Sequence, residues 1–326
     1  MTRSYKVAVI GLGKIGSLYS SLKVSRSHAE AYMKNPKTNL VAGVDSNKNA
    51  QKKFKRKWGK NIKSFSTTRE MLSTFQPDIV SICVPTDKLI YILKEISKKP
   101  PKFLFLEKPV INDISIEKKI KKIINTPTAV NYHRCWDPSH SLFFRKIKKS
   151  GKILSIHIIY NKGMFNYASH IISLLIFHFG KVSSVKDLKT NNHDTKKLDP
   201  SYSFVLCFKY GFQAIFQGFD YISHDLLELE IISSSGIYSI KSGGCRKRLE
   251  LPRKGAFYKN YNQLVDVPYK DKDGQVDGIT QAISNIVNFL DGKEKKIISD
   301  IKAALEVSRI LFKIKKIKTN YGKKFN

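Results

Sequence analysis

Long hydrophobic runs, clustered cysteines and acidic residues are all scarce in this chain of 326 residues. The first apolar run, Val7–Ile10, stops at Gly11 and is too short for the core of a secretory signal. The longest later run, around Ile171–Phe179, is broken by Ser173 and His178, so it cannot span a bilayer. We therefore expect no signal peptide, no membrane partner and a cytoplasmic location.

Cysteines are few and far apart, at Cys83, Cys135, Cys207 and Cys245. The sequence has no CxxC pair and no Cys/His cluster, which argues against a zinc site, and we expect no bound metal. Two of the four cysteines lie inside apolar runs, which is typical of reduced, buried thiols in a cytosolic protein.

Acidic residues are outnumbered by basic ones, 26 against 59, so the formal net charge is +33. Such an excess is found in nucleic-acid-binding proteins. Here, however, lysine pairs such as Lys52-Lys53, Lys148-Lys149 and Lys295-Lys296 are spread along the whole chain. A general preference for lysine explains this distribution better, and we expect no nucleic-acid partner. The charge would still attract an anionic ligand such as a nucleotide sugar.

In the first 130 residues, unbroken apolar segments alternate with lysine-rich amphipathic stretches. Strands of a parallel sheet, buried on both faces, have this pattern. The alternation predicts a doubly wound parallel sheet, that is, a Rossmann domain over residues 1–130. The expected strands are Lys6–Ile10, Leu40–Val44, Ile79–Val84, Phe103–Leu106 and Ala129–Asn131, and the expected helices include Lys88–Ser97 and Ser115–Ile124.

The pattern changes after about Asp137, where several strands follow one another directly. We predict a second α/β domain over residues 131–326, built on a large, mostly antiparallel open sheet, so that the whole chain is of the α/β class. A free sheet face suggests a homo-oligomer. The expected elements are strands at Ile153–Tyr160, Tyr202–Tyr210, Phe212–Phe219, Leu226–Ile232 and Gly236–Ile240, and helices at Phe165–Phe179, Ile279–Leu290 and Ile301–Phe312.

A Gly-x-Gly-x-x-Gly motif follows the first predicted strand directly and precedes a helical start. Its first glycine makes a tight turn, its second lets the backbone approach a pyrophosphate, and its third allows close packing of helix and strand. A helix N-terminus adds free N–H groups. In this context the motif predicts a dinucleotide site. The residues expected to contact the cofactor here are Gly11, Gly13, Lys14, Ile15 and Gly16.

Asp45 ends the second predicted strand and is the expected partner of the adenosine ribose hydroxyls. It comes later than the usual spacing of about 20 residues, so Ser17–Asn39 must carry an insertion. An acid here favours NAD, because it would repel a 2′-phosphate, while Lys48 and Lys52 leave NADP open. The alternative role for Asp45 is a plain turn at a strand end.

Glu107-Lys108-Pro109 follows the fourth predicted strand, and at this point the chain resembles the Gfo/Idh/MocA family of oxidoreductases. The resemblance runs nearly end to end and includes GLGKIG, LVAGVD ending in Asp45, PDIVSICVPT ending in Thr86, NYHRCWDPS at Asn131–Ser139, and NKGMFNYASH ending in His170. It implies a nicotinamide near Lys108 and His170, which we assign as catalytic groups. It also implies that Pro85, Thr86 and Glu107 contact the cofactor together with Lys108.

The chemistry of these residues supports the assignment. Lys108 follows the carboxyl end of a parallel strand, where open α/β sheets bind ligands, and Pro109 disfavours a helical backbone at that lysine. His170 titrates near neutral pH and suits acid–base catalysis. A solvated lysine and a core histidine are the alternatives. We predict that the glycine loop, Lys108 and His170 converge on one crevice between the two domains.

Three positions depart from the pattern that the resemblance implies. Relatives often have Asp where Asn166 stands, and an amide can bind a hydroxyl but cannot act as a base. Relatives also commonly have His at the position of Leu89 and Asp at the position of Ser173. The proton transfer therefore falls to His170 and Lys108.

Further candidates for substrate binding, besides Asn166, are Tyr132, Arg134 and Trp136. Aromatic faces stack on sugars, and the guanidinium group of Arg pairs with carboxylates or phosphates. Packing between the domains is the alternative role for these three.

The sequence thus predicts an NAD(P)-dependent oxidoreductase that acts on a CH–OH group of a sugar or nucleotide sugar. By resemblance alone, it is similar to enzymes that make unusual sugars for surface glycans. The alternative is a catalytically weakened NAD(H)- or sugar-binding protein of the same fold, in which the three departures have reduced activity.

Overall fold

The computed structural model describes residues 4–20, 24–188, 198–219, 224–244, 246–255, 260–269 and 277–322. The chain divides into unit 1, Met1–Asp137 with Asp277–Ser308, and unit 2, Pro138–Val276 with Arg309–Asn326. This division differs from the predicted boundary after residue 130, because the segment from Asp277 to Ser308 returns to unit 1. Its helix α8 (Gly278–Leu290) buries the apolar side chains of Ala282, Ile283 and Ile286 in the core of unit 1.

Unit 1 contains sheet A, which among the described residues has six parallel strands in the order β3-β2-β1-β4-β5-β6. This order confirms the predicted Rossmann sheet, and it places a switch point at the carboxyl ends of β1 and β4, where such sheets bind ligands. The strands are β1 (Tyr5–Ile10), β2 (Thr38–Val44), β3 (Lys63–Phe65), β4 (Ile79–Ile82), β5 (Phe103–Leu106) and β6 (Thr128–Val130). All four residues of β4 and of β5 are buried, as expected for strands covered on both faces.

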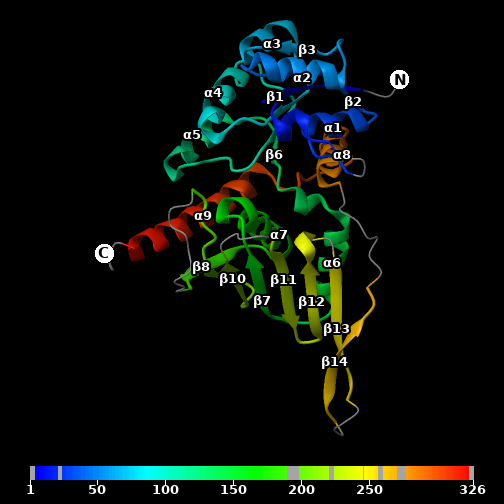
Figure 1. Ribbon diagram of the computed structural model, residues 1–326, viewed down its shortest axis with the longest axis vertical. Coiled ribbons are helices and arrows are strands. Elements are labelled where there is room, and N and C mark those ends of the chain that lie inside the picture. The colour runs from blue at the N-terminus through cyan, green and yellow to red at the C-terminus, as the bar shows by residue number, and fades with distance from the viewer. Residues whose placement is uncertain are drawn as a thin grey trace. The chain divides into compact units, whose positions relative to one another are not determined.

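Helices cover sheet A on both faces (Figure 1). Right-handed crossovers put α1 (His28–Lys34) and α2 (Lys48–Trp58) on one face, where α1 packs against α8. They put α3 (Thr68–Thr74), α4 (Thr86–Ile96) and α5 (Glu117–Ile123) on the other. Shorter turns are the π-helical η1 (Lys14–Leu18) and the 3-10 helices η2 (Ile114–Ile116) and η3 (His133–Trp136).

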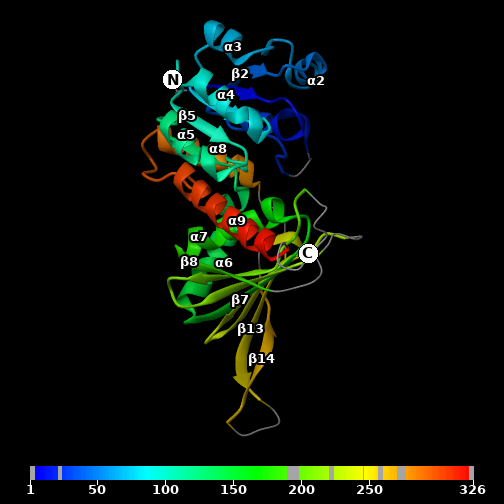
Figure 2. The same cartoon turned by 90° about the vertical axis from the view of Figure 1, so that its left-hand side faces the viewer.

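Unit 2 contains sheet B, in which the described residues form eight strands in the order β14-β13-β12-β11-β7-β10-β9-β8. Among the described strands of sheet B only β7 and β10 pair in parallel, so the predicted, mostly antiparallel sheet is confirmed. The strands are β7 (Ile153–Tyr160), β8 (Val182–Asp187), β9 (Phe204–Phe208), β10 (Gln213–Gly218), β11 (Leu227–Ser233), β12 (Gly236–Lys241), β13 (Arg246–Lys254) and β14 (Asn262–Val267). Figure 2 shows β13 and β14 extending past the other strands.

Two helices cover one face of sheet B, α6 (Pro138–Lys149) and α7 (Ser169–Phe179). The ring of Phe143 in α6 meets that of Tyr238 edge to face, and Phe179 in α7 meets Phe212 in the same way. Buried and half-buried residues alternate along β11, so the opposite face carries the polar positions. The π-helical turn η4 (Met164–Ala168) leads into α7, η5 (Ser242–Gly244) joins β12 to β13, and α9 (Ile301–Gly322) ends the described chain.

Of the described cysteines, Cys83, Cys135 and Cys207, none forms a disulfide, while Cys245 lies outside the described residues. Burial, followed by the nearby charge of Glu107, raises the pKa of the Cys83 thiol, so this thiol stays protonated and unreactive. Among the residues that the structure describes, no helix is long and apolar enough to cross a bilayer.

Candidate functional site

The glycine motif forms the turn between β1 and η1 at the carboxyl edge of sheet A. Gly11 has a φ of +91°, and a Cβ atom there would lie 2.5 Å from the carbonyl oxygen of Cys83. A Cβ atom on Gly16 would lie 1.9 Å from the carbonyl oxygen of Gly11. The fold therefore requires glycine at both positions, as the motif predicts.

Gly13 is different, because a Cβ atom there would meet nothing within 4 Å. The fold itself does not require glycine at this position, whereas a pyrophosphate approaching the backbone would. Lys14 and Ile15, which follow, are exposed. The loop thus leaves open the space that a dinucleotide phosphate would take, and its residues fit that group.

The far end of the turn is held by α2. The Lys57 ammonium donates to the carbonyl oxygen of Leu18 at 2.7 Å, and the Trp58 indole N–H donates to that of Ser17 at 3.2 Å. Two side chains thus satisfy carbonyl groups that the short η1 turn leaves free at its end. Neither residue was identified from the sequence.

Asp45 follows β2 and lies beside the glycine loop. Its carboxylate accepts the backbone N–H of Leu12 at 2.8 Å through one oxygen and that of Asn47 at 2.8 Å through the other. The side chain is half-buried, so it shapes the loop and still reaches the edge of the sheet. This position fits the predicted contact with a ribose.

The Glu107-Lys108-Pro109 segment follows β5 at the same edge. The peptide bond between Lys108 and Pro109 is cis, and the Thr86 hydroxyl donates to the carbonyl oxygen of Pro109 at 2.9 Å. Thr86 begins α4 and follows the exposed Pro85. Lys108 is half-buried. The structure thus brings the predicted cofactor-binding residues of unit 1 to one edge of sheet A.

A buried hydrogen-bonded network lies behind Glu107, and the sequence reading missed it. His28, at the start of α1, is fully buried, and its Nε2 lies 2.8 Å from Oε1 of Glu107. Its Nδ1 lies 2.9 Å from the Ser81 hydroxyl, and the Tyr32 hydroxyl lies 2.8 Å from that of Ser81. Asn131, which follows β6, donates its amide to the same Glu107 oxygen at 2.6 Å.

These bonds run in one direction when the imidazole carries its proton on Nε2. Tyr32 then donates to Ser81, Ser81 donates to Nδ1 of His28, and His28 donates to the carboxylate of Glu107. Burial raises the pKa of the Tyr32 hydroxyl, so it keeps the proton that it donates. The hydroxyls of Tyr32 and Ser81 and both ring nitrogens of His28 therefore each take part in a hydrogen bond.

The network defines what Glu107 can do. Its Oε1 receives two donors from side chains, and its Oε2 accepts the backbone N–H of Lys108 at 3.3 Å. A carboxylate held in this way is suited to fixing the backbone of Lys108 rather than to taking a proton from a substrate. Within Glu107-Lys108-Pro109, the lysine amine is the group suited to proton transfer.

In unit 2, the segment Asn161–His170 is anchored by Asp199. The backbone N–H groups of Phe165 and Asn166 each donate to the Asp199 carboxylate at 2.9 Å. A Cβ atom on Gly163 would lie 2.2 Å from that carboxylate, which explains the glycine. Asn166 is exposed on η4, and His170 is buried in the first turn of α7 at 7% exposure.

The other candidates for substrate binding lie in or beside η3 of unit 1. Tyr132 is fully buried, and Arg134 is half-buried. Trp136 is 4% exposed, lies edge to face with Phe105, and its indole N–H bonds to Asn285 at 3.3 Å. For Trp136 these contacts indicate packing in the core of unit 1.

Two of the three positions that depart from the pattern implied by the resemblance are interior. Leu89 is 4% exposed in α4, and Ser173 is 5% exposed in α7. Among the described residues, no group of three His, Cys, Asp or Glu side chains could hold a metal ion.

Comparison with known proteins agrees with the geometry. Residues 5–130 match the family Gfo/Idh/MocA, described as an oxidoreductase family with an NAD-binding Rossmann fold. A comparison with curated protein sequences finds no match.

Solved structures of similar fold cover nearly the whole chain at low sequence identity. A dehydrogenase from Chromobacterium violaceum is 14% identical, with a TM-score of 0.76 and 99% of each chain covered. The WlbA dehydrogenase from Bordetella pertussis, in complex with NADH and UDP-GlcNAcA, is 15% identical, with a TM-score of 0.75 and coverage of 96% of this chain and 95% of that one. A super-repressor mutant of Gal80p from Saccharomyces cerevisiae is 13% identical, with a TM-score of 0.76 and 96% of each chain covered.

Proposed function

Because residues 5–130 belong to the Gfo/Idh/MocA oxidoreductase family with its NAD-binding Rossmann fold, we propose that this chain is an NAD(P)-dependent oxidoreductase acting on a CH–OH group of a sugar or nucleotide sugar. The observation that carries the proposal is the gathering of Gly13, Asp45 and Lys108 at the carboxyl edge of sheet A. A bound nicotinamide would supply the acceptor or donor of hydride.

The chain's own residues would then bind and move the proton. Lys108 would hold the substrate hydroxyl through its amine, in a position set by Glu107. His170 would act as acid or base, and Asn166 would bind a hydroxyl without taking its proton. Arg134, which is half-buried, suits an anionic part of the substrate. Of the aromatic candidates, Tyr132 and Trp136 are buried and suit packing better than stacking on a sugar.

The nucleotide-sugar class is supported by two observations. The similar WlbA dehydrogenase was solved with NADH and UDP-GlcNAcA. The net charge of +33 also favours an anionic substrate, because it raises the local concentration of anions at the surface. Asp45 favours NAD over NADP, since its carboxylate would repel a 2′-phosphate.

The test is to incubate the protein with NAD⁺ or NADP⁺ and each member of a panel of sugars and nucleotide sugars. Turnover is measured as the increase in absorbance of the reduced cofactor. Lys108→Met and His170→Ala should each lower kcat by about 10²-fold or more. Lys102→Met is the matched control, because Lys102 lies just before β5, at the opposite edge of the sheet, and pairs with Asp78. Unchanged turnover in both site variants would refute the assigned roles.

The alternative is a protein that binds NAD(H) or a sugar without turnover. It is favoured by the similarity to Gal80p, whose solved form is a super-repressor mutant, and by Asn166 in place of an acid. Tight binding of NADH, measured by its fluorescence, together with no turnover of any panel member would support this alternative. We also propose that the chain forms a homo-oligomer, which a measurement of its molar mass in solution tests.

A further inference from the structure

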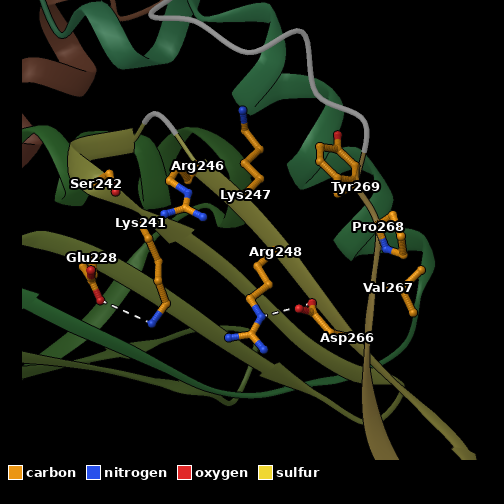
Figure 3. Close-up of a pocket in the computed structure, with 10 residues that line it drawn as sticks. All are labelled: Glu228, Lys241, Ser242, Arg246, Lys247, Arg248, Asp266, Val267, Pro268 and Tyr269. Carbon is orange, nitrogen blue, oxygen red and sulfur yellow. Dashed lines mark ion pairs between the residues drawn. The ribbon is translucent and has the colours of Figure 1, made fainter.

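A cavity of about 680 Å³ lies on sheet B, lined by the ends of β12, β13 and β14 (Figure 3). It contains none of the residues assigned above to cofactor binding or catalysis. We propose that this cavity binds the phosphate or carboxylate group of a small anionic metabolite, and that Arg246 is its main ligand, with Lys241 and Ser242 beside it.

The charges around the cavity are unequal. Of the described residues that line it, four are basic and two are acidic, Glu228 and Asp266. Both acids are already paired: Glu228 lies 3.4 Å from the Lys241 ammonium, and Asp266 lies 3.0 Å from the Arg248 guanidinium. Figure 3 shows these two pairs on either side of Arg246.

The other basic side chains are also engaged. Arg248 forms a second ion pair with Glu250 at 3.1 Å, and Lys247 donates to the Ser139 hydroxyl at 2.8 Å. Arg246, by contrast, is exposed and has no acidic partner within the part of the chain that the structure describes. Its guanidinium group is therefore available to an external anion.

The register of the sheet places two positive charges opposite each other, and a bound anion would relieve their repulsion. Lys241 on β12 lies directly opposite Arg246 on β13. Like charges facing each other across two strands destabilise a sheet. An anion held between these two side chains would convert the repulsion into two attractions.

General lysine usage does not explain this cluster. The chain has 59 basic residues, of which 49 are lysines and ten are arginines. Three of the ten arginines, Arg246, Arg248 and Arg253, lie on the nine-residue strand β13. Arginine offers a planar fork of donors that matches phosphate and carboxylate oxygens in pairs, which lysine does not.

The walls also bear on the kind of ligand. Val267, Pro268 and Tyr269 line one side of the cavity, opposite Lys241 and Ser242 (Figure 3). A bare ion would leave this less polar side unused. The cavity is therefore suited to a small molecule with one anionic group and an uncharged part.

The test is calorimetric titration of the full chain at low salt with glucose 1-phosphate and, separately, with gluconate as a carboxylate probe, each in the presence of saturating NADH to occupy the glycine loop. We expect Arg246→Gln to weaken binding of the preferred probe by at least tenfold and Arg246→Lys to weaken it less. Arg253→Gln is the matched control, because Arg253 is exposed on the same strand outside the cavity, and it should leave the dissociation constant unchanged.

Tighter binding of the phosphate identifies a phosphorylated ligand, and tighter binding of gluconate identifies a carboxylated one. Absence of binding by both probes, or equal weakening in Arg246→Gln and Arg253→Gln, would overturn the proposal, since the latter would show a general charge effect. Ligand-free Arg246→Gln should melt no lower than the native protein, because it loses only a repulsive contact. A lower melting temperature would contradict the absence of a partner for Arg246. None of these results depends on turnover.

Discussion

Replacing His28 by leucine would remove two hydrogen bonds from the interior of unit 1 while roughly preserving the volume of the side chain. The bond to the charged Glu107 contributes about 1.5–3 kcal/mol. The Ser81 hydroxyl would also lose its acceptor, and an unsatisfied buried donor costs about 1–3 kcal/mol. Because leucine recovers part of this through its apolar surface, we expect the free energy of unfolding to fall by about 3 kcal/mol.

The free energy of unfolding is measured by urea denaturation, with tryptophan fluorescence as the signal. The two tryptophans of the chain, Trp58 and Trp136, both lie in unit 1, so the signal reports on the unit that contains His28. His157→Leu is the control, because His157 is exposed on sheet B and its bond to Ser155 is local.

The control should change the stability by less than about 0.5 kcal/mol. His28→Gln, which can still donate to the Glu107 carboxylate, should recover part of the loss. If the free energy of unfolding of His28→Leu lay within about 0.5 kcal/mol of that of the native protein, the hydrogen bonds of His28 would not hold Glu107 in place.

Two further predictions concern the glycine loop and a buried histidine. Gly13→Ala should keep the native melting temperature but weaken NADH binding at least tenfold, measured by fluorescence, whereas Gly16→Ala should destabilise the fold because its Cβ would meet the Gly11 carbonyl. Burial, then the charges of Lys148 and His140, lowers the pKa of His178 to about 3. Between about pH 6.5 and 3 only the unfolded chain binds that proton, so stability falls as pH falls, by up to about 1.4 kcal/mol per unit. His178→Phe keeps the stacking on Phe144. In urea unfolding, its free energy of unfolding relative to that of the native protein should rise by about 2 kcal/mol as the pH falls from about 7 to 5. The same relative stability at both pH values would refute this prediction.

The elements with strong apolar patterns could be predicted from the sequence. The strand predicted at Ile153–Tyr160 is β7 with the same bounds, and the strand at Phe103–Leu106 is β5. The glycine motif and Asp45 also lie where their order along the chain predicts, because carboxyl ends of parallel strands meet at one edge. Residues near each other in sequence, or tied to strand ends, are therefore accessible to sequence reasoning.

Elements with weak apolar patterns were missed. Apart from Leu249, every residue of the strands β13 and β14 is exposed or half-buried, so no run of buried apolar residues marks these strands in the sequence. Helix α3 was missed although a signal was present, since Thr67 and Glu70 form a capping box that marks its start. The return of α8 to unit 1 could not be foreseen, because an apolar helix face does not identify the core that receives it.

The position of Lys108 shows most clearly why a motif is not yet a site. The sequence Glu107-Lys108-Pro109 alone determines neither where the Glu107 carboxylate points nor what surrounds the Lys108 amine. That direction comes from His28, which lies 79 residues before Glu107, and from Asn131, 24 residues after it. Partners so far apart in the sequence cannot be recognised from the sequence alone. A single histidine at the start of a helix gives no reason to expect a hydrogen bond to a glutamate at the end of a distant strand. The fixed position of the carboxylate, and with it the proton-transfer role that we propose for the Lys108 amine, can be argued only from these hydrogen bonds.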